Sequence, residues 1–170
     1  MAVNAINWLQ DKAPGFRELQ ADEQTAIMQF SLLWSLFEAR ALNTHGSARA
    51  IVAVTRLWAE QSLLKEKSFA REIAYFQNRY YRDGAFTHHF HNLHLGRSDQ
   101  QALVERVLKN DTPDSAEVAA AALIIVYRFR NNRFHGVKWA YEIRGQFENF
   151  THANAVLMQA IELHERGNGR

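Results

Sequence analysis

AEVAAAALIIV spans Ala116–Val126 and carries one charged residue, Glu117, near its start. From Val118 to Val126 every position is alanine, valine, leucine or isoleucine, so a helix through this segment is apolar on all sides. Such a helix needs other elements to cover it completely. We therefore predict a buried central helix with partner layers supplied either by the same chain or by a second copy in a symmetric dimer.

Helical periodicity continues on both sides of this segment. Four residues fall at i, i+3, i+4 and i+7 and form one apolar stripe: Phe30, Leu33, Trp34 and Phe37. Further helices are predicted after a Ser47 N-cap, over 67–81, from a Ser98/Gln101 capping box to about residue 109, from Thr112-Pro113 through the central segment, and over 145–166. Strand signals are nearly absent. The sequence predicts an all-α fold of about five main helices, with 22–170 as a single domain and 1–21 as an N-terminal arm or short helix.

Composition limits the class of protein. The chain has 170 residues, of which 47% are hydrophobic and 22% charged, as in an ordinary globular domain. It has no cysteine, which excludes disulfides and thiolate chemistry. No apolar run reaches the roughly 20 residues needed to cross a bilayer, and MAVNAINWLQDKAP lacks the features of a signal peptide. We expect a cytoplasmic protein that does not bind a membrane.

A polar run, YRFRNNRFHG at Tyr127–Gly136, follows the apolar segment abruptly. The formal net charge of the chain is +2. The stretch 127–144 alone has a balance of +4, from one anion, Glu142, and five cations: Arg128, Arg130, Arg133, Lys138 and Arg144. A local basic patch attracts a polyanion such as RNA, and the alternative is an ordinary solvated face.

Arg130 and His135 suit the cleavage of RNA. The 2′-hydroxyl of RNA is the nucleophile, so a ribonuclease without metal or other cofactor needs only proton transfer and stabilisation of the charge at phosphorus. Histidine exchanges protons near neutral pH, and arginine offers a planar fork to phosphate oxygens. Asn131 and His135 are four residues apart and share a helical face, so Asn131 is expected to orient the imidazole. The alternative is a histidine that only complements the helix dipole.

Two stretches resemble the HEPN superfamily of all-α domains. RNNRFHG resembles the R-x-x-x-x-H signature of that family, and FSLLWSLFEAR resembles the L-W-x-x-F-E pattern in the first helix of a plasmid-associated prokaryotic branch. The resemblance implies a helical bundle that dimerises so that two motifs face one cleft. It also implies a metal-independent endoribonuclease of a toxin–antitoxin or defence system, with RNA as substrate and a nucleotidyltransferase-type antitoxin as a candidate partner. An inactive module that binds RNA, nucleotide or protein is the alternative.

Carried over by residue, the resemblance makes Arg130 and His135 catalytic, with Asn131 in support. Glu38 matches the glutamate in the first helix of the family and is expected to pair with a motif arginine, with an exposed salt bridge as the alternative. Arg133 departs from the apolar residue that is usual there. The predicted RNA contacts are Arg128, Arg133 and Lys138.

Two other clusters have competing interpretations. His88, His91 and His94 are three residues apart, which permits a metal site, a surface loop or a lining of the RNA cleft; no metal site is expected, because no further ligand is evident. An aromatic group with interspersed cations favours either base stacking or the core: Tyr75, Phe76, Arg79, Tyr80, Tyr81, Arg82 and Phe86. The helical spacing of Ile73, Phe76 and Tyr80 favours the core. Trp34 and Trp58 are also predicted to lie in the core.

Overall fold

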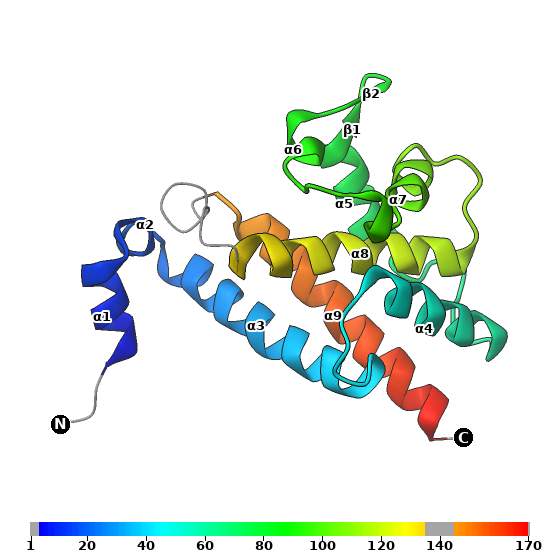
Figure 1. The fold of residues 1–170 in the computed structure, drawn as a ribbon, viewed down its shortest axis with the longest axis horizontal. Coiled ribbons are helices and arrows are strands. Elements are labelled where there is room, and N and C mark those ends of the chain that lie inside the picture. The colour runs from blue at the N-terminus through cyan, green and yellow to red at the C-terminus, as the bar shows by residue number, and fades with distance from the viewer. Residues whose placement is uncertain (1–3, 135–144, 170) are drawn as a thin grey trace.

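The computed structural model describes residues 4–134 and 145–169, and this part of the chain is mainly helical (Figure 1). Its five long helices are α3 (Ala21–Ala41), α4 (Ala48–Glu60), α5 (Ala70–Tyr80), α8 (Ser115–Phe134) and α9 (Phe147–Asn168). The shorter helices are α1 (Ala5–Lys12), α2 (Pro14–Arg17), α6 (His88–His91), α7 (Gln101–Leu108) and a 3₁₀ turn at Arg97–Asp99. The predicted all-α class is confirmed for the described residues, apart from one small hairpin.

The hairpin consists of two short antiparallel strands, β1 (Tyr81–Arg82) and β2 (Ala85–Phe86). Asp83 and Gly84 form the turn, and both have positive φ angles. Asp-Gly is the dipeptide that such two-residue hairpin turns favour. The sequence prediction placed the end of a helix at this dipeptide but did not predict the strands around it.

Helix α8 is the centre of the molecule. Every side chain from Ala119 to Val126 is at most 1% exposed, as the sequence predicts, whereas Val118, also predicted to be buried, is partly exposed. Helices α4, α5, α7 and α9 of the same chain pack around it (Figure 1). Because one chain supplies the covering layers, this stretch of α8 leaves no face for a second copy.

Helices α3 and α9 lie side by side and run in the same direction (Figure 1). Phe30 meets Phe150 edge-on, with ring centroids 5.3 Å apart. The buried Asn154 side-chain amide donates to the Ala26 carbonyl at 3.1 Å, which ties α9 to the backbone of α3. The stripe predicted on α3 faces this core, with Phe30, Trp34 and Phe37 at 1%, 3% and 0% exposed.

Other predicted core residues are also buried. Trp58 is 1% exposed, and Ile73, Phe76 and Tyr80 are 6%, 0% and 2% exposed. The aromatic stripe of α5 therefore belongs to the core, which excludes Phe76 and Tyr80 as an exposed platform for base stacking. No helix within the described part of the chain has the length and apolarity needed to cross a membrane.

The helix starts predicted from capping patterns are right at one place and wrong at two. Ser47 caps α4, and its hydroxyl accepts from the Ala50 N–H at 3.1 Å. Helix α8 begins at Ser115, because Asp114 and Glu117 accept from each other's N–H groups at 2.8 and 3.2 Å in a capping box. The predicted start at Thr112-Pro113 is wrong, since Thr112 has a φ of 45°, outside the extended conformation of an N-cap.

The second wrong start concerns α7. Ser98 lies inside the 3₁₀ turn, and α7 begins only at Gln101, after Gln100 in a left-handed conformation. The carboxylate of Asp99 accepts from the Gly96 N–H at 3.1 Å and stabilises this turn instead. In this position Asp99 lies next to Arg128 of α8, the helix that carries the polar run.

Candidate functional site

The polar run begins where α8 leaves the core. After Val126, fully buried, the residues from Tyr127 to Asn132 are each partly exposed. Aromatic side chains still anchor this end: the Tyr127 ring lies 5.8 Å from that of Trp34, and the Phe129 ring meets Phe76 edge-on at 6.1 Å. The abrupt change in sequence therefore matches the passage of one rigid helix from the core to the surface, which presents polar groups on a fixed backbone.

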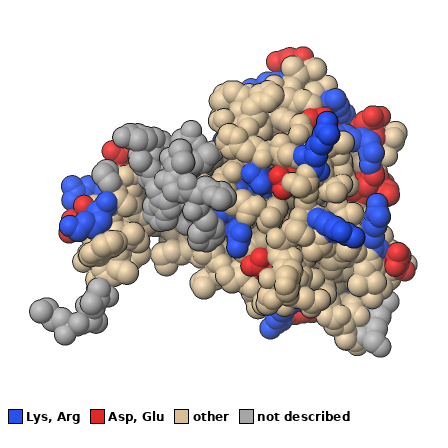
Figure 2. All heavy atoms as spheres, viewed as in Figure 1, with Lys and Arg blue, Asp and Glu red and all other residues tan. Residues whose placement is uncertain are grey.

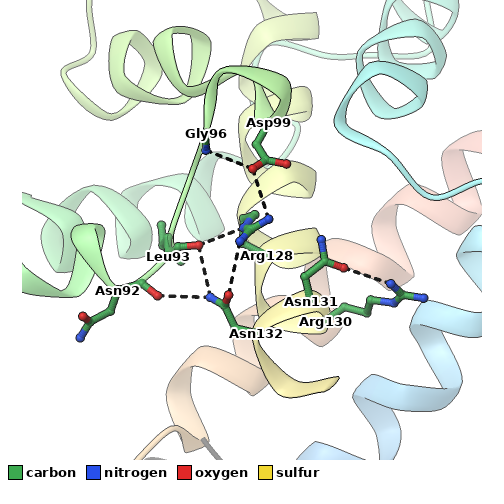
Figure 3. A network of polar contacts seen from close by, with 8 residues as sticks. All are labelled: Asn92, Leu93, Gly96, Asp99, Arg128, Arg130, Asn131 and Asn132. Carbon is green, nitrogen blue, oxygen red and sulfur yellow. Dashed lines mark hydrogen bonds and ion pairs between the residues drawn. The ribbon is translucent and has the colours of Figure 1, made fainter. Parts of the chain in front are cut away.

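Arg128 is held inside the protein (Figure 3). Its Nε donates to the Leu93 carbonyl at 2.9 Å, and its Nη1 pairs with the Asp99 carboxylate at 3.2 Å. The two charged side chains are only 14% and 15% exposed, so water screens the pair little. Arg128 was predicted to contact RNA, and the structure instead shows its guanidinium fixing the segment before α7 to α8.

Asn132 adds to these contacts, and we call Arg128, Asp99 and Asn132 the clamp. This role of Asn132 was not predicted. Its amide Nδ2 donates to the carbonyls of Asn92 and Leu93 at 3.2 and 3.3 Å, and its Oδ1 accepts from Arg128 at 3.4 Å. The only local signal in the sequence is that Arg128 and Asn132 are four residues apart and share a helical face. Their common partner, the 92–99 segment, is too distant in sequence to be inferred.

Arg130 and Asn131 point away from the clamp, on the other side of α8 (Figure 3). The Arg130 Nη1 donates to the Asn131 Oδ1 at 3.0 Å, and both side chains are partly buried. Asn131 was predicted to orient His135, but its oxygen orients the arginine. Its amide nitrogen is the atom that could still hydrogen-bond an imidazole. A guanidinium is a donor group that can hold phosphate oxygens.

Three predicted site residues are not tested by this geometry. His135 and Lys138 lie outside the described residues, and so does the side chain of Arg133. Their roles in catalysis and RNA contact remain predictions from the sequence.

The described contacts of Glu38 are local, and its pairing with a motif arginine stays a prediction. Its Oε2 accepts from the Trp34 indole N–H at 3.3 Å, and its Oε1 accepts from the Gly46 N–H at 3.1 Å. These donors are local, one turn earlier on α3 and in the loop that follows, so the carboxylate fixes the α3–α4 connection.

The histidine segment forms no metal site in the described chain. His88, His91 and His94 are exposed, and no group of three potential ligands gathers among the residues that the structure describes. Burial, Arg79 and His88 lower the pKa of His89, whose ring lies 3.9 Å from that of His88.

Charges of both signs are mixed over the face seen in Figure 2, around a largely uncharged middle. Lys and Arg side chains alternate there with Asp and Glu rather than forming one basic field. Most of the predicted basic stretch lies outside the described residues, so the +4 balance of 127–144 is a property of the sequence.

A scan against protein-family models found no match for this sequence, and comparisons with curated proteins and with solved structures found none either. The function is therefore inferred from the residues of this chain and their contacts.

Proposed function

We propose that the chain is a metal-independent endoribonuclease of the HEPN type, acting in the cytoplasm as a homodimer. The observation that carries this proposal is the pair formed by Arg130 and Asn131, in which an amide oxygen holds a partly buried guanidinium on the last turns of α8. His135 follows Arg130 by five residues in the sequence. Arginine and histidine are the two residue types that the reaction needs.

In the proposed reaction the 2′-oxygen of RNA attacks the adjacent phosphorus, and the bond from phosphorus to the 5′-oxygen breaks. One imidazole removes the proton of the 2′-hydroxyl and another group protonates the leaving oxygen. The guanidinium of Arg130 stabilises the charge that builds on the phosphate oxygens. The products carry a 2′,3′-cyclic phosphate and a 5′-hydroxyl.

A second copy would supply the second imidazole. The buried centre of α8 no longer argues for a dimer, because the same chain covers it. The outer face of α3 supports a dimer, because it carries an exposed apolar stripe. Met28, Leu32 and Leu36 fall at i, i+4 and i+8 and are 50%, 73% and 40% exposed. No charged residue occurs from Gln24 to Phe37, so two copies can approach there without repulsion between like charges. A contiguous exposed apolar stripe marks an interaction surface.

The test compares wild type with Arg130→Ala and His135→Ala on mixed RNA in EDTA, with the product ends mapped. Arg56→Ala, an exposed α4 arginine, and His91→Ala are matched controls. We expect each motif variant to lose at least about 100-fold in cleavage while keeping its helical spectrum, since a proton-transfer group contributes about 10²–10⁴-fold. Full activity in either variant contradicts the assignment.

RNA binding without cleavage by the wild type would favour the inactive binding module. In that case binding should weaken steeply with salt, and Arg130→Ala should weaken it further. The proposed nucleotidyltransferase-type antitoxin would be tested separately, by whether its co-expression suppresses cleavage.

A further inference from the structure

A second group of basic side chains lies where α5 ends and α6 begins, apart from the polar run at the end of α8. The Thr87 hydroxyl donates to the Arg79 carbonyl at 2.8 Å, and the Thr87 N–H donates to the Tyr80 carbonyl at 2.9 Å. These bonds join the start of α6 to the last turn of α5. His88 and His89 follow directly, so two imidazoles are anchored beside the end of the helix that carries Arg79.

One nitrogen of the Arg79 guanidinium lacks an acceptor, although the side chain hydrogen-bonds the hydroxyls of Tyr75 and Tyr80. Its Nε is a buried polar atom with no hydrogen-bond partner, which is uncommon in native proteins. None of the ion pairs formed by the described residues includes Arg79. The buried Glu72 is on the same helix but seven residues earlier, about 10 Å along the axis. A partly buried cation without a counter-ion is destabilising unless something else supplies the anion.

Arg79 lies near the hydroxyls of Tyr75 and Tyr80, and the carboxylate of Glu148 acts on Tyr75 as well. Burial raises the pKa of Tyr75 and of Tyr80, while the charge of Arg79 and a hydrogen bond from it act in the opposite direction on both hydroxyls. Arg79 also helps to lower the pKa of His89, after the effect of burial. Phenol hydroxyls and the His89 imidazole, which can donate hydrogen bonds, therefore lie around the guanidinium.

We propose that Arg79, with His88 and His89 beside it, binds a phosphoryl group. Guanidinium and imidazole N–H groups are donors that recognise phosphate oxygens. The source is either the backbone of a bound nucleic acid, which rests on the function proposed above, or a free phosphate compound. This site is distinct from Arg130 and does not require cleavage.

The test is the shift in thermal unfolding midpoint caused by pyrophosphate, and by a single-stranded DNA oligonucleotide, relative to sodium chloride at equal ionic strength. Neither probe has a cleavable 2′-hydroxyl, so the result stands whether or not the protein cuts RNA. A ligand that binds only the folded state raises the midpoint. We expect such a rise for the wild type and its loss in Arg79→Gln, which should bind at least about tenfold more weakly because a hydrogen bond to a charged group contributes about 1.5–3 kcal/mol.

Arg82→Gln is the matched control, since it removes the same charge from an exposed arginine three residues away. It should keep the full shift. A shift with both probes supports nucleic acid as the source, and a shift with pyrophosphate alone supports a free phosphate compound. The absence of a shift in the wild type, or an equal shift in Arg79→Gln, overturns the proposal. Should Arg79→Gln fail to fold, Arg79→Lys keeps the charge but not the fork and should lose most of the shift.

Discussion

Arg128 and Asp99, 29 residues apart in sequence, form an ion pair of 3.2 Å that is largely shielded from water. The pair joins the motif helix α8 to the segment that precedes α7, and Asn132 reinforces it from the next turn. Arg128, which the sequence assigns to RNA, thus holds the fold together only two residues before the proposed catalytic residue, Arg130.

Removing Asp99 should therefore destabilise the protein. Asp99→Ala leaves the Arg128 charge unpaired and the Gly96 N–H without its acceptor, so we expect a loss of about 2–4 kcal/mol in the free energy of unfolding. Urea denaturation followed by circular dichroism measures it. Asp11→Ala breaks the exposed pair with Arg17 and should cost less than about 0.5 kcal/mol. Equal losses in the two variants would show that the Arg128 pair is not structural.

The centre of α8 should tolerate little change. Leu123 is fully buried, so Leu123→Ala should reduce the free energy of unfolding by about 2–5 kcal/mol through lost apolar burial and the remaining cavity. Leu57, 45% exposed on α4, is the matched control, and Leu57→Ala should change stability by less than about 1 kcal/mol. A mild effect at Leu123 would mean that α8 is not the core helix.

The outer face of α3 should decide the oligomeric state. Leu32→Lys places a charge in the middle of the exposed apolar stripe and should convert a dimer into a folded monomer, because two such charges would face each other or be buried. Sedimentation velocity at several concentrations gives the mass. Leu57→Lys, at an exposed apolar site outside the stripe, should remain dimeric. A wild type that is monomeric at the highest concentration rules out this interface.

His152 should make stability depend on acid pH. Burial lowers its pKa below the usual 6.5, as does Arg71, while the nearby carboxylates of Glu72 and Glu148 raise it. The unfolded chain then binds the proton more readily than the folded one. The contribution of His152 is fully present above about pH 6.5 and is lost as the pH falls below it.

The ring of His152 stacks on Tyr75, with centroids 4.0 Å apart. His152→Gln should therefore lose less stability than the wild type between pH 7.5 and 5.5, as urea unfolding at each pH would show, since glutamine does not titrate in this range. His164→Gln, which changes another histidine of α9 in the same way, is the comparison. Parallel pH profiles for wild type and His152→Gln would contradict the prediction.

The sequence by itself determined the helical class and the main buried surfaces. The apolar run of α8 and the stripe of α3 are local patterns, and helical periodicity converts such patterns directly into burial. The hydroxyl cap at Ser47 is local in the same way. The Asp114 and Glu117 capping box of α8 could also have been read from its three-residue spacing, so the error at that helix start lies in the choice between two adjacent capping patterns.

Only the tertiary structure decided what covers α8 and what the polar residues at its end contact. The partners of Arg128 and Asn132 are 29 to 40 residues away in the chain, and no short-range spacing encodes such pairs. Glu38 shows the opposite case, because nearby N–H donors engaged a carboxylate that the motif pattern assigned to a distant arginine. Periodicity fixes which face of a helix is buried, whereas hydrogen-bond partners depend on which segments the fold brings within 3.5 Å, and that is set by the packing of the whole chain.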